Sequence, residues 1–433
     1  MQRERHPFRH HARVLAAALV GTAVEFYDFY VYATAAALVF GPLFFPAQSA
    51  SAQLLLSLMS FGLAFVARPV GAVAFGHFGD RLGRKSTLFV SLMLMGISTL
   101  LIAFLPTYQM IGWAAPLLLC ILRFGQGFGL GGEWGGAALL AVENAPKGWE
   151  ARFGAAPQLG APLGFLAANG LFLVLGLFLS DKDFIDWGWR IPFLLSAVLV
   201  GLGLWVRYRI GETPAFTEAL ERQSLHSLPF GRLLRHHWPA VMAGSAAVVA
   251  CFAIFYLSTA FALGHMTTAR HHHRETVLAI ELVANVFLAL GIVLAALWAD
   301  QANSRNVLIA GSIGTILLGG MFGPMLAFGS LFAVLVMLSF ALLVMGFTYG
   351  PLGAWLPTLF PVPLRYTGVS LAFNFGGIVG GGLVPIAAQW LSGQGQTLLV
   401  GLFLAVAGVI TLFGVVLGRL GGKGEHVVAP PVG

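Results

Sequence analysis

Long apolar runs recur along the whole chain, and they constrain its fold more than any other feature. Twelve runs can be separated, and each approaches or exceeds the ~20 residues that a helix needs to cross a bilayer. Backbone N–H and C=O groups cannot stay unsatisfied in lipid, so the runs predict helices rather than open strands. The predicted membrane-spanning helices cover residues 12–40, 54–78, 87–105, 113–142, 153–179, 189–207, 239–263, 276–298, 307–328, 331–355, 366–391 and 397–418.

Charged side chains are correspondingly scarce. The 433 residues include 24 Lys+Arg and 17 Asp+Glu, or 9%, whereas a soluble domain carries about 25% charged residues. This composition excludes an ordinary soluble globular protein and a disordered chain. We therefore expect an all-α polytopic membrane protein, in which the few charges mark either topology or function.

The basic residues predict how the chain is oriented. If the N-terminus is cytoplasmic and the spans alternate, 18 Lys and Arg lie on the cytoplasmic side and 4 on the opposite side. Cytoplasmic loops collect Lys and Arg, so this distribution predicts a multi-pass protein of the cell inner membrane with both termini in the cytoplasm. It also explains the net charge of +7 without a nucleic-acid partner. Trp187 and Trp189 are expected in an aromatic belt at the membrane surface.

The longest polar stretch divides the predicted helices into two sets of six. The sets echo one another, because Asp80–Lys85 follows the second span and Asp300–Arg305 follows the eighth. Segments 146–154 and 361–368 also share the order Pro, Arg, Gly. Two six-helix repeats around a central cavity are typical of transporters. The predicted parts are a six-helix bundle (1–207), a cytoplasmic loop with a short amphipathic helix starting near Thr213 (208–237), a second six-helix bundle (238–420) and a short tail (421–433).

Several segments resemble a known family. Residues 76–85, Gly-His-Phe-Gly-Asp-Arg-Leu-Gly-Arg-Lys, resemble the loop signature of the major facilitator superfamily. The resemblance implies the twelve-helix fold of that superfamily and proton-coupled uptake of a small carboxylate or zwitterion. The second-half loop keeps Asp300 but lacks the Gly-Arg pair, so the resemblance does not imply a second charged gate there. Segments 21–29, 65–71, 123–127, 131–134, 187–193, 212–216 and 359–368 resemble the metabolite:proton symporter branch, which includes permeases of the α-ketoglutarate, shikimate and proline/betaine type.

The turn after the second predicted span is a candidate cytoplasmic gate. Gly83 permits the tight turn, Asp80 can pair with a basic residue or face a helix N-terminus, and the basic side chains can pair with carboxylates across the gate. The alternative interpretation is a positive anchor at the cytoplasmic surface. Arg68 lies about three helical turns from Asp80 and belongs either to the gate or to the binding site. The gate candidates are Arg68, Asp80, Arg81, Gly83, Arg84, Lys85, Asp300 and Arg365.

Glu25 and Asp28 are the main candidates for proton coupling. With Tyr32 they form one stripe along the first predicted helix. A carboxylate at the bilayer centre costs roughly 2.5–3.5 kcal/mol on insertion scales, so each needs a partner, water or a proton. The alternative is a fixed salt bridge to Arg68 or Arg123. Glu133, in a glycine-rich segment, is the third coupling candidate, although it need not face the same site.

Arg123 is the candidate for binding a substrate carboxylate, because a guanidinium offers a planar fork that stays charged. The alternative is a permanent pairing with Glu25 or Asp28. A group of polar side chains on other predicted spans could hydrogen-bond substrate, or could join helices at roughly 0.6 kcal/mol each. The group comprises Tyr32, Gln126, Gln158, Asn169, Tyr256, Glu281, Asn285 and Asn374.

No motif points to an enzyme, a cofactor or a metal. The sequence has no P-loop, nucleophile elbow or H-E-x-x-H pattern, and the run His271–His273 lacks metal-ligand spacing. We expect a secondary active transporter, acting as a monomer in lipid, that carries protons with a small organic acid or zwitterion by alternating access. The alternatives are a proton-coupled antiporter that exports amphiphiles, and a membrane sensor that binds without transport.

Overall fold

The twelve predicted spans all have helical counterparts in the computed structural model. The structure describes residues 7–47, 49–82, 84–131, 133–209, 233 and 235–421, and every regular element in these ranges is helical. Ten of its segments are long and apolar enough to cross a membrane. An eleventh is the pair Asp181–Gly188 and Arg190–Gly201, bent by 43°, and Phe89–Ile102 is a shorter apolar helix. The predicted all-α polytopic fold is therefore confirmed.

The first half supplies six of these spans, several of them built from consecutive helices. The predicted amphipathic helix near Thr213 lies outside the described residues, so the bounds of the central loop stay a prediction. The elements are α1 (Pro7–Ala35), η1 (Ala36–Phe40), α2 (Gly41–Phe44), α3 (Ala50–Leu82), α4 (Arg84–Ile102), α5 (Tyr108–Ile111), α6 (Ala114–Leu130), α7 (Glu133–Glu143), α8 (Glu150–Gln158), α9 (Gly160–Phe178), α10 (Asp181–Asp183), η2 (Phe184–Gly188) and α11 (Arg190–Arg209).

The second half supplies the other six spans. Its elements are α14 (Trp238–Tyr256), η3 (Leu257–Phe261), α15 (Ala262–Thr268), α16 (Arg274–Gln301), α17 (Ser304–Phe328), α18 (Leu331–Tyr349), α19 (Leu352–Trp355), η4 (Leu356–Leu359), η5 (Val362–Leu364), α20 (Arg365–Gly377), η6 (Ile378–Leu383), α21 (Val384–Gly393), η7 (Thr397–Val400) and α22 (Gly401–Gly421). The predicted C-terminal tail beyond residue 421 lies outside the described residues.

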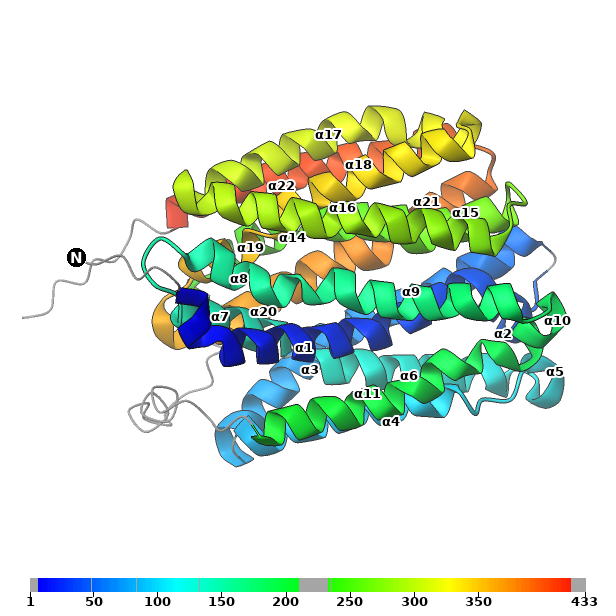
Figure 1. Cartoon of the computed structure of the whole chain (residues 1–433), viewed down its shortest axis with the longest axis horizontal. Coiled ribbons are helices and arrows are strands. Elements are labelled where there is room, and N and C mark those ends of the chain that lie inside the picture. The colour runs from blue at the N-terminus through cyan, green and yellow to red at the C-terminus, as the bar shows by residue number, and fades with distance from the viewer. Residues whose placement is uncertain are drawn as a thin grey trace, which may run out of the picture.

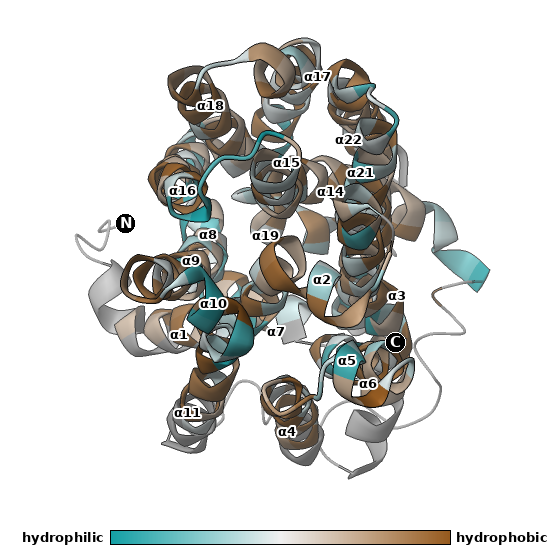
Figure 2. Cartoon of the chain, turned by 90° about the vertical axis from the view of Figure 1, so that its right-hand side faces the viewer, coloured by the Kyte–Doolittle hydropathy of each residue, from teal (hydrophilic) through white to brown (hydrophobic). Residues whose placement is uncertain are grey.

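The spans run side by side along one axis (Figure 1). α1 begins and α22 ends at the same end of the bundle, on the left in Figure 1. We call this the predicted cytoplasmic end, and the other the predicted outer end. Viewed from the outer end, the spans are largely hydrophobic, whereas α5, α10 and the loop after α15 are hydrophilic (Figure 2). This distribution fits helices that face lipid and loops that face water.

The two halves meet along two seams. α9 of the first half packs on α16 of the second, and α3 packs on α20, η6 and α21. Glycine permits close approach at the predicted cytoplasmic end, where a Cβ on Gly353 would lie 2.8 Å from the carbonyl oxygen of Gly154. Small residues at helix contacts are the usual means of close packing in membranes. Residues from both halves therefore enclose the centre of the molecule.

Four of the described spans contain a π-helical turn. The turns are η1 in the first span, η2 at the bend of the sixth, η3 in the seventh and η6 in the eleventh. The first and seventh spans are the equivalent first helices of the two predicted repeats. π-helical turns often occur at functional sites because they redirect side chains within a continuous helix. The sequence pattern did not indicate these turns.

Candidate functional site

Arg123 of α6 lies fully buried in a box of aromatic rings. Its guanidinium carbon is 4.0 Å from the ring centroid of Tyr32, 4.2 Å from that of Phe29 and 4.8 Å from that of Phe61. Nε donates a hydrogen bond to the Phe61 carbonyl at 3.4 Å, and Nη1 donates to the Gln126 side-chain oxygen. Nη2 has no hydrogen-bond partner within the described part of the chain. A buried charged donor without a partner is costly, so this atom is placed to receive an acceptor.

Arg68 of α3 lies beside Arg123 at the centre. Its guanidinium carbon is 4.2 Å from the same Phe29 centroid and 4.8 Å from that of Phe65. The two guanidinium carbons are therefore at most 8.4 Å apart, which is twice 4.2 Å. Among the residues that the structure describes, Nε of Arg68 has no hydrogen-bond partner either. The structure thus places Arg68 in the central cluster, the second of the two positions considered for it, and its gate role stays a prediction.

Asp28 is joined to Arg123 by a chain of hydrogen bonds. Its carboxylate accepts from the Ser196 hydroxyl at 2.5 Å and from the Thr99 hydroxyl at 3.5 Å. The Gln126 amide donates to the Thr99 hydroxyl at 2.8 Å and to the Asp28 carbonyl at 3.0 Å. Gln126 in turn accepts from Arg123. A coupling candidate and a substrate candidate therefore share one network.

Two members of this network, Thr99 and Ser196, were not predicted. Both are small hydroxyl side chains within long apolar runs, and such residues commonly bond within their own helix. Thr99 does so as well, because it also donates to the Met95 carbonyl at 2.9 Å. What distinguishes these two hydroxyl groups is their contact with Asp28 in the packed structure. The sequence alone does not reveal that contact.

Of the other two coupling candidates, the structure describes the side chain of Glu25 but not that of Glu133. Glu25 is buried one turn before Asp28 in α1 and lies within electrostatic range of Arg68. The side chain of Glu133 lies outside the described residues. The gate candidates Asp80, Arg81, Gly83, Arg84 and Lys85 also lie outside them, as residue or side chain, so their roles stay predictions.

The centre of the molecule is closed in this conformation. Trp134 of α7 stacks on Phe373 of α20 with ring centroids 3.6 Å apart. The cavity at the centre measures about 10 Å³, which is about the size of one water molecule. The predicted binding residue Tyr256 lines it, together with Phe26, Tyr30, Tyr349 and other apolar residues of both halves. A metabolite can therefore enter only after the halves move apart.

Most of the predicted polar binding residues join the two halves by hydrogen bonds. The Gln158 side chain accepts from the Trp134 indole N–H at 3.1 Å and donates to the Tyr349 carbonyl at 3.2 Å. The Asn285 amide donates to the Pro162 carbonyl at 2.8 Å. The Asn374 amide donates to the Gly131 carbonyl at 2.7 Å, where α6 gives way to α7. Tyr32 differs, since its hydroxyl bonds Ser60 within the first half at 2.8 Å.

Glu281 and Asn169 form a further polar contact between the halves. The Asn169 amide of α9 donates to one oxygen of the Glu281 carboxyl of α16 at 3.2 Å. The Thr34 hydroxyl donates to the Asn169 side-chain oxygen at 2.5 Å. Glu281 is fully buried. In this conformation these residues hold the halves together, and their contact with substrate stays a prediction.

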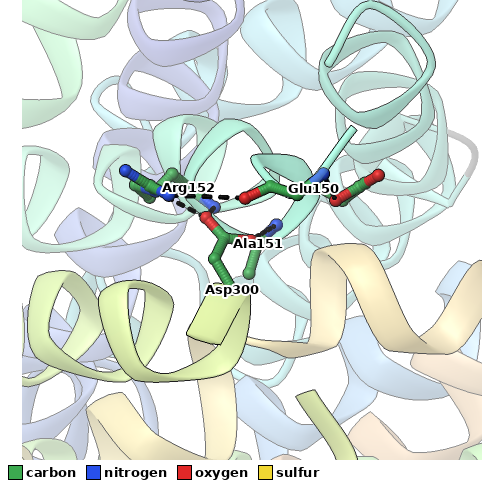
Figure 3. Close-up of polar contacts among 5 residues, drawn as sticks. Glu150, Ala151, Arg152 and Asp300 are labelled. Atoms are coloured by element: carbon green, nitrogen blue, oxygen red, sulfur yellow. Dashed lines mark hydrogen bonds and ion pairs between the residues drawn. The ribbon is translucent and has the colours of Figure 1, made fainter. Parts of the chain in front are cut away.

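Asp300 joins the two halves at the predicted cytoplasmic end. Its carboxylate accepts from Nε of Arg152 at 2.6 Å and from the backbone N–H groups of Ala151 and Arg152 at 2.8 Å and 3.2 Å (Figure 3). These N–H groups belong to the first turn of α8, where the helix dipole also favours an anion. The contact joins α16 to the first half. Asp300 was a gate candidate, whereas Arg152 was considered only as a basic residue that indicates topology and as part of the Pro, Arg, Gly pattern of segment 146–154.

Arg365 lies near this contact at the start of α20. It lines an open cavity of about 520 Å³ together with Glu150, Arg305, Trp355 and Thr358. The predicted outer end carries its own contact between halves, because the Gln389 amide donates to the Ser51 hydroxyl at 3.1 Å. Described contacts therefore join the halves at both ends, with a closed centre between them.

Comparisons with known proteins agree with this architecture. Residues 14–228 match the family described as "Sugar (and other) transporter". The inner membrane metabolite transport protein YhjE of Escherichia coli (strain K12) is 44% identical, with 96% of each chain covered. The shikimate transporter of the same strain is 38% identical over 88% of this chain and 87% of its own. The proline/betaine transporter of Salmonella typhimurium is 30% identical over 92% of this chain and 82% of its own.

Solved structures show the same fold at lower sequence identity. The crystal structure of a D-xylose–proton symporter superposes with a TM-score of 0.72 at 17% identity, covering 92% of this chain and 96% of that chain. A partially occluded inward-open structure of the E. coli xylose transporter gives 0.62 at 17% identity, with 95% of each chain covered. These relatives and structures are membrane transporters rather than enzymes. The chain therefore belongs to the family of these metabolite transporters, and its fold is the one seen in proton symporters of the major facilitator superfamily.

Proposed function

We propose that this protein is a proton-coupled symporter that takes up a small organic acid by alternating access. The observation that supports this most directly is the central pair Arg68 and Arg123, buried around one phenylalanine ring, with hydrogen-bond donors that have no partner among the described residues. Guanidinium groups bind carboxylates with two parallel hydrogen bonds. A carboxylate between the two arginines would satisfy these donors and offset their charge.

The surroundings favour an anion over a zwitterion. The cationic part of a zwitterion needs a carboxylate or an unoccupied aromatic face, and we assign the nearby carboxyl groups of Glu25 and Asp28 to proton coupling. The faces of Phe29, Tyr32 and Phe61 already contact guanidinium groups. Among the relatives, the shikimate transporter is 38% identical and the proline/betaine transporter 30% identical. An acid with a compact, partly apolar body therefore suits this box better than a quaternary ammonium compound.

Proton coupling is assigned to the carboxyl groups beside the arginines. The hydrogen bonds from Asp28 through Thr99 and Gln126 to Arg123 would couple the protonation of the Asp28 carboxyl to the substrate site. Binding one proton together with one monoanion leaves the net charge of the cluster unchanged, whereas binding either one alone changes it by one unit. Low net charge makes it easier to enclose the site, since unpaired charges away from water are costly. The loaded form would close and reopen, whereas an unbalanced form would close rarely.

Uptake into proteoliposomes tests the proposal. A monoanion carried with one proton moves no net charge, so a pH gradient of one unit should give about tenfold accumulation. Radiolabelled shikimate and radiolabelled glycine betaine are the two probes, with the membrane potential clamped. We expect shikimate to accumulate without a transport current. Uptake that ignores the pH gradient would exclude proton coupling, and current-carrying uptake of betaine alone would exclude an anionic substrate.

A further inference from the structure

Glu281 lies at the seam between the halves with only part of its hydrogen-bonding capacity used. The carboxyl is fully buried, and one oxygen accepts from the Asn169 amide at 3.2 Å. The other oxygen has no hydrogen-bond partner among the described residues. An ionised carboxylate in this position would leave a buried charge with a single neutral donor. Such a group costs several kcal/mol unless it is paired or neutralised.

A second acceptor without a partner lies one helical turn away. Asn285 follows Glu281 by four residues in α16, so both side chains occupy the same face. The Asn285 amide donates to the Pro162 carbonyl, while its side-chain oxygen has no hydrogen-bond partner in the part of the chain that is described. Glu281 Oε1 and Asn285 Oδ1 are therefore two buried acceptors on one helix face, and neither receives a hydrogen bond from a described residue. A proton on Glu281 would supply that hydrogen.

The charged groups on the surrounding elements do not compensate Glu281. α16 packs on α8, α9, α15, α17 and α18. α9 carries no ionisable side chain, and α18 carries only Tyr349. Arg274 and Glu275 lie near the start of α16, about 10 Å along the helix, and they pair with each other at 2.7 Å. His265 of α15 bonds Ser392, and the groups Glu150, Arg152, Asp300 and Arg305 lie at the predicted cytoplasmic end, where α16 ends.

We propose that Glu281 is a proton-binding site whose protonation permits α9 and α16 to close on each other. In the closed form the protonated carboxyl accepts from Asn169 and donates toward Asn285. When the seam opens, water reaches the carboxyl and the proton can leave. This inference rests on the proposed symport, and it adds a proton site in the second half to the candidates in α1.

A substrate-free measurement tests proton binding directly. The probe is the infrared C=O stretching band of a protonated carboxyl, recorded for the purified protein in lipid at neutral pH. We expect the band of the wild type to lose intensity in Glu281→Gln, and any band that remains to come from the carboxyl groups of α1. Glu275→Gln is the matched control, because it removes a partly exposed, ion-paired acid from the same helix, and it should keep the band. A spectrum unchanged by Glu281→Gln would overturn the inference.

Transport measurements test the coupling. Glutamine keeps the acceptor for Asn169 and adds a donor, so Glu281→Gln should close without a proton. We expect it to retain shikimate counterflow but to lose the roughly tenfold accumulation per pH unit, while Glu275→Gln retains both. Glu281→Asp, which keeps an acid, should restore part of the accumulation if the glutamine variant is poorly folded. Full accumulation by Glu281→Gln would overturn the inference while leaving the proposed symport intact.

The two proposals can fail separately. If the wild type accumulates neither shikimate nor betaine under a pH gradient, the proposed symport of these substrates fails. The infrared band then still decides whether Glu281 binds a proton, because that measurement needs no substrate. A loss of band intensity in Glu281→Gln would support the site in that case, and an unchanged intensity would reject it.

Discussion

At the scale of single residues, Arg123 combines a permanent charge with surroundings from which water is excluded. Three aromatic rings lie within 4.8 Å of its guanidinium carbon. A desolvated contact between a cation and a ring contributes about 2 kcal/mol, so the rings partly replace lost hydration. They do not occupy the N–H donors at the edge of the guanidinium. The residue is therefore stabilised in place while Nη2, at one edge, has no hydrogen-bond partner among the described residues.

Replacing Arg123 with lysine tests this division of roles. Lysine keeps the charge but loses the planar fork, and hydrogen bonds to charged groups contribute about 1.5–3 kcal/mol. We expect kcat/KM for shikimate uptake to fall by roughly tenfold or more in Arg123→Lys. Arg270→Lys, at an exposed loop position, is the control and should transport normally. Unchanged kinetics in Arg123→Lys would remove Arg123 from the substrate role.

At the scale of elements, the halves are held by contacts between helix ends and by close backbone approach. Asp300 at the end of α16 contacts the first turn of α8. Gly353 of α19 contacts Gly154, which also lies in α8. Both contacts lie at the predicted cytoplasmic end. They involve few residues, so small free-energy changes can alter whether this end is open or closed.

Asp300→Asn should favour opening at the predicted cytoplasmic end. The side chain of Arg152 is 24% exposed, so water screens the ion pair and its loss costs about 1 kcal/mol. We expect roughly a fivefold shift toward the open form, measured by the distance between spin labels placed on the two halves. Asp183→Asn, exposed at the other end, should leave that distance distribution unchanged. An unaltered distribution in Asp300→Asn would show that other contacts close this end.

Gly353→Ala should keep the halves apart at the same end. The added Cβ would lie 2.8 Å from a backbone oxygen, which cannot move independently of α8. Overpacking of this kind costs about 1–3 kcal/mol, so we expect slower uptake and a lower melting temperature. Gly170→Ala in α9 is the matched control, since its Cβ would meet nothing within 4 Å. Equal behaviour of the two variants would contradict tight contact at Gly353.

At the scale of the whole molecule, the described contacts correspond to a closed transporter. Cross-half hydrogen bonds occur at both ends, and the central cavity of about 10 Å³ has no room for a metabolite. Binding must therefore be coupled to a rearrangement of complete helices. Any substrate that binds only the folded protein will raise its stability by mass action.

A thermal-shift titration tests substrate class at this scale. A ligand at about 100 times its Kd stabilises the folded state by about 2.7 kcal/mol. We expect shikimate to raise the melting temperature of the purified protein, and glycine betaine and D-xylose to leave it unchanged. Arg123→Lys should lose most of the shikimate effect. Stabilisation by betaine alone would contradict an anionic substrate.

The sequence predicted the spans because lipid imposes a long apolar run on each of them. It did not predict features that depend on packing between runs. Trp189, expected in an aromatic belt at the membrane surface, lies at the bend between η2 and α11 and is fully buried against Phe40 and Phe193. The contact of Arg152 with Asp300 joins residues 148 positions apart, and no local pattern indicates such a pair.

One continuous helix, α16, makes two separate contacts with the first half. Glu281 contacts α9, and Asp300 contacts α8. Glu281 and Asp300 are 19 residues apart, or about 28 Å along an uninterrupted axis. Unlike the spans with π-helical turns, α16 has no internal break within Arg274–Gln301 at which one part could move alone. A tilt that separates α16 from α9 near Glu281 therefore also displaces Asp300 relative to α8. This stiffness would discourage simultaneous opening of both ends, and with it a leak of protons through the protein.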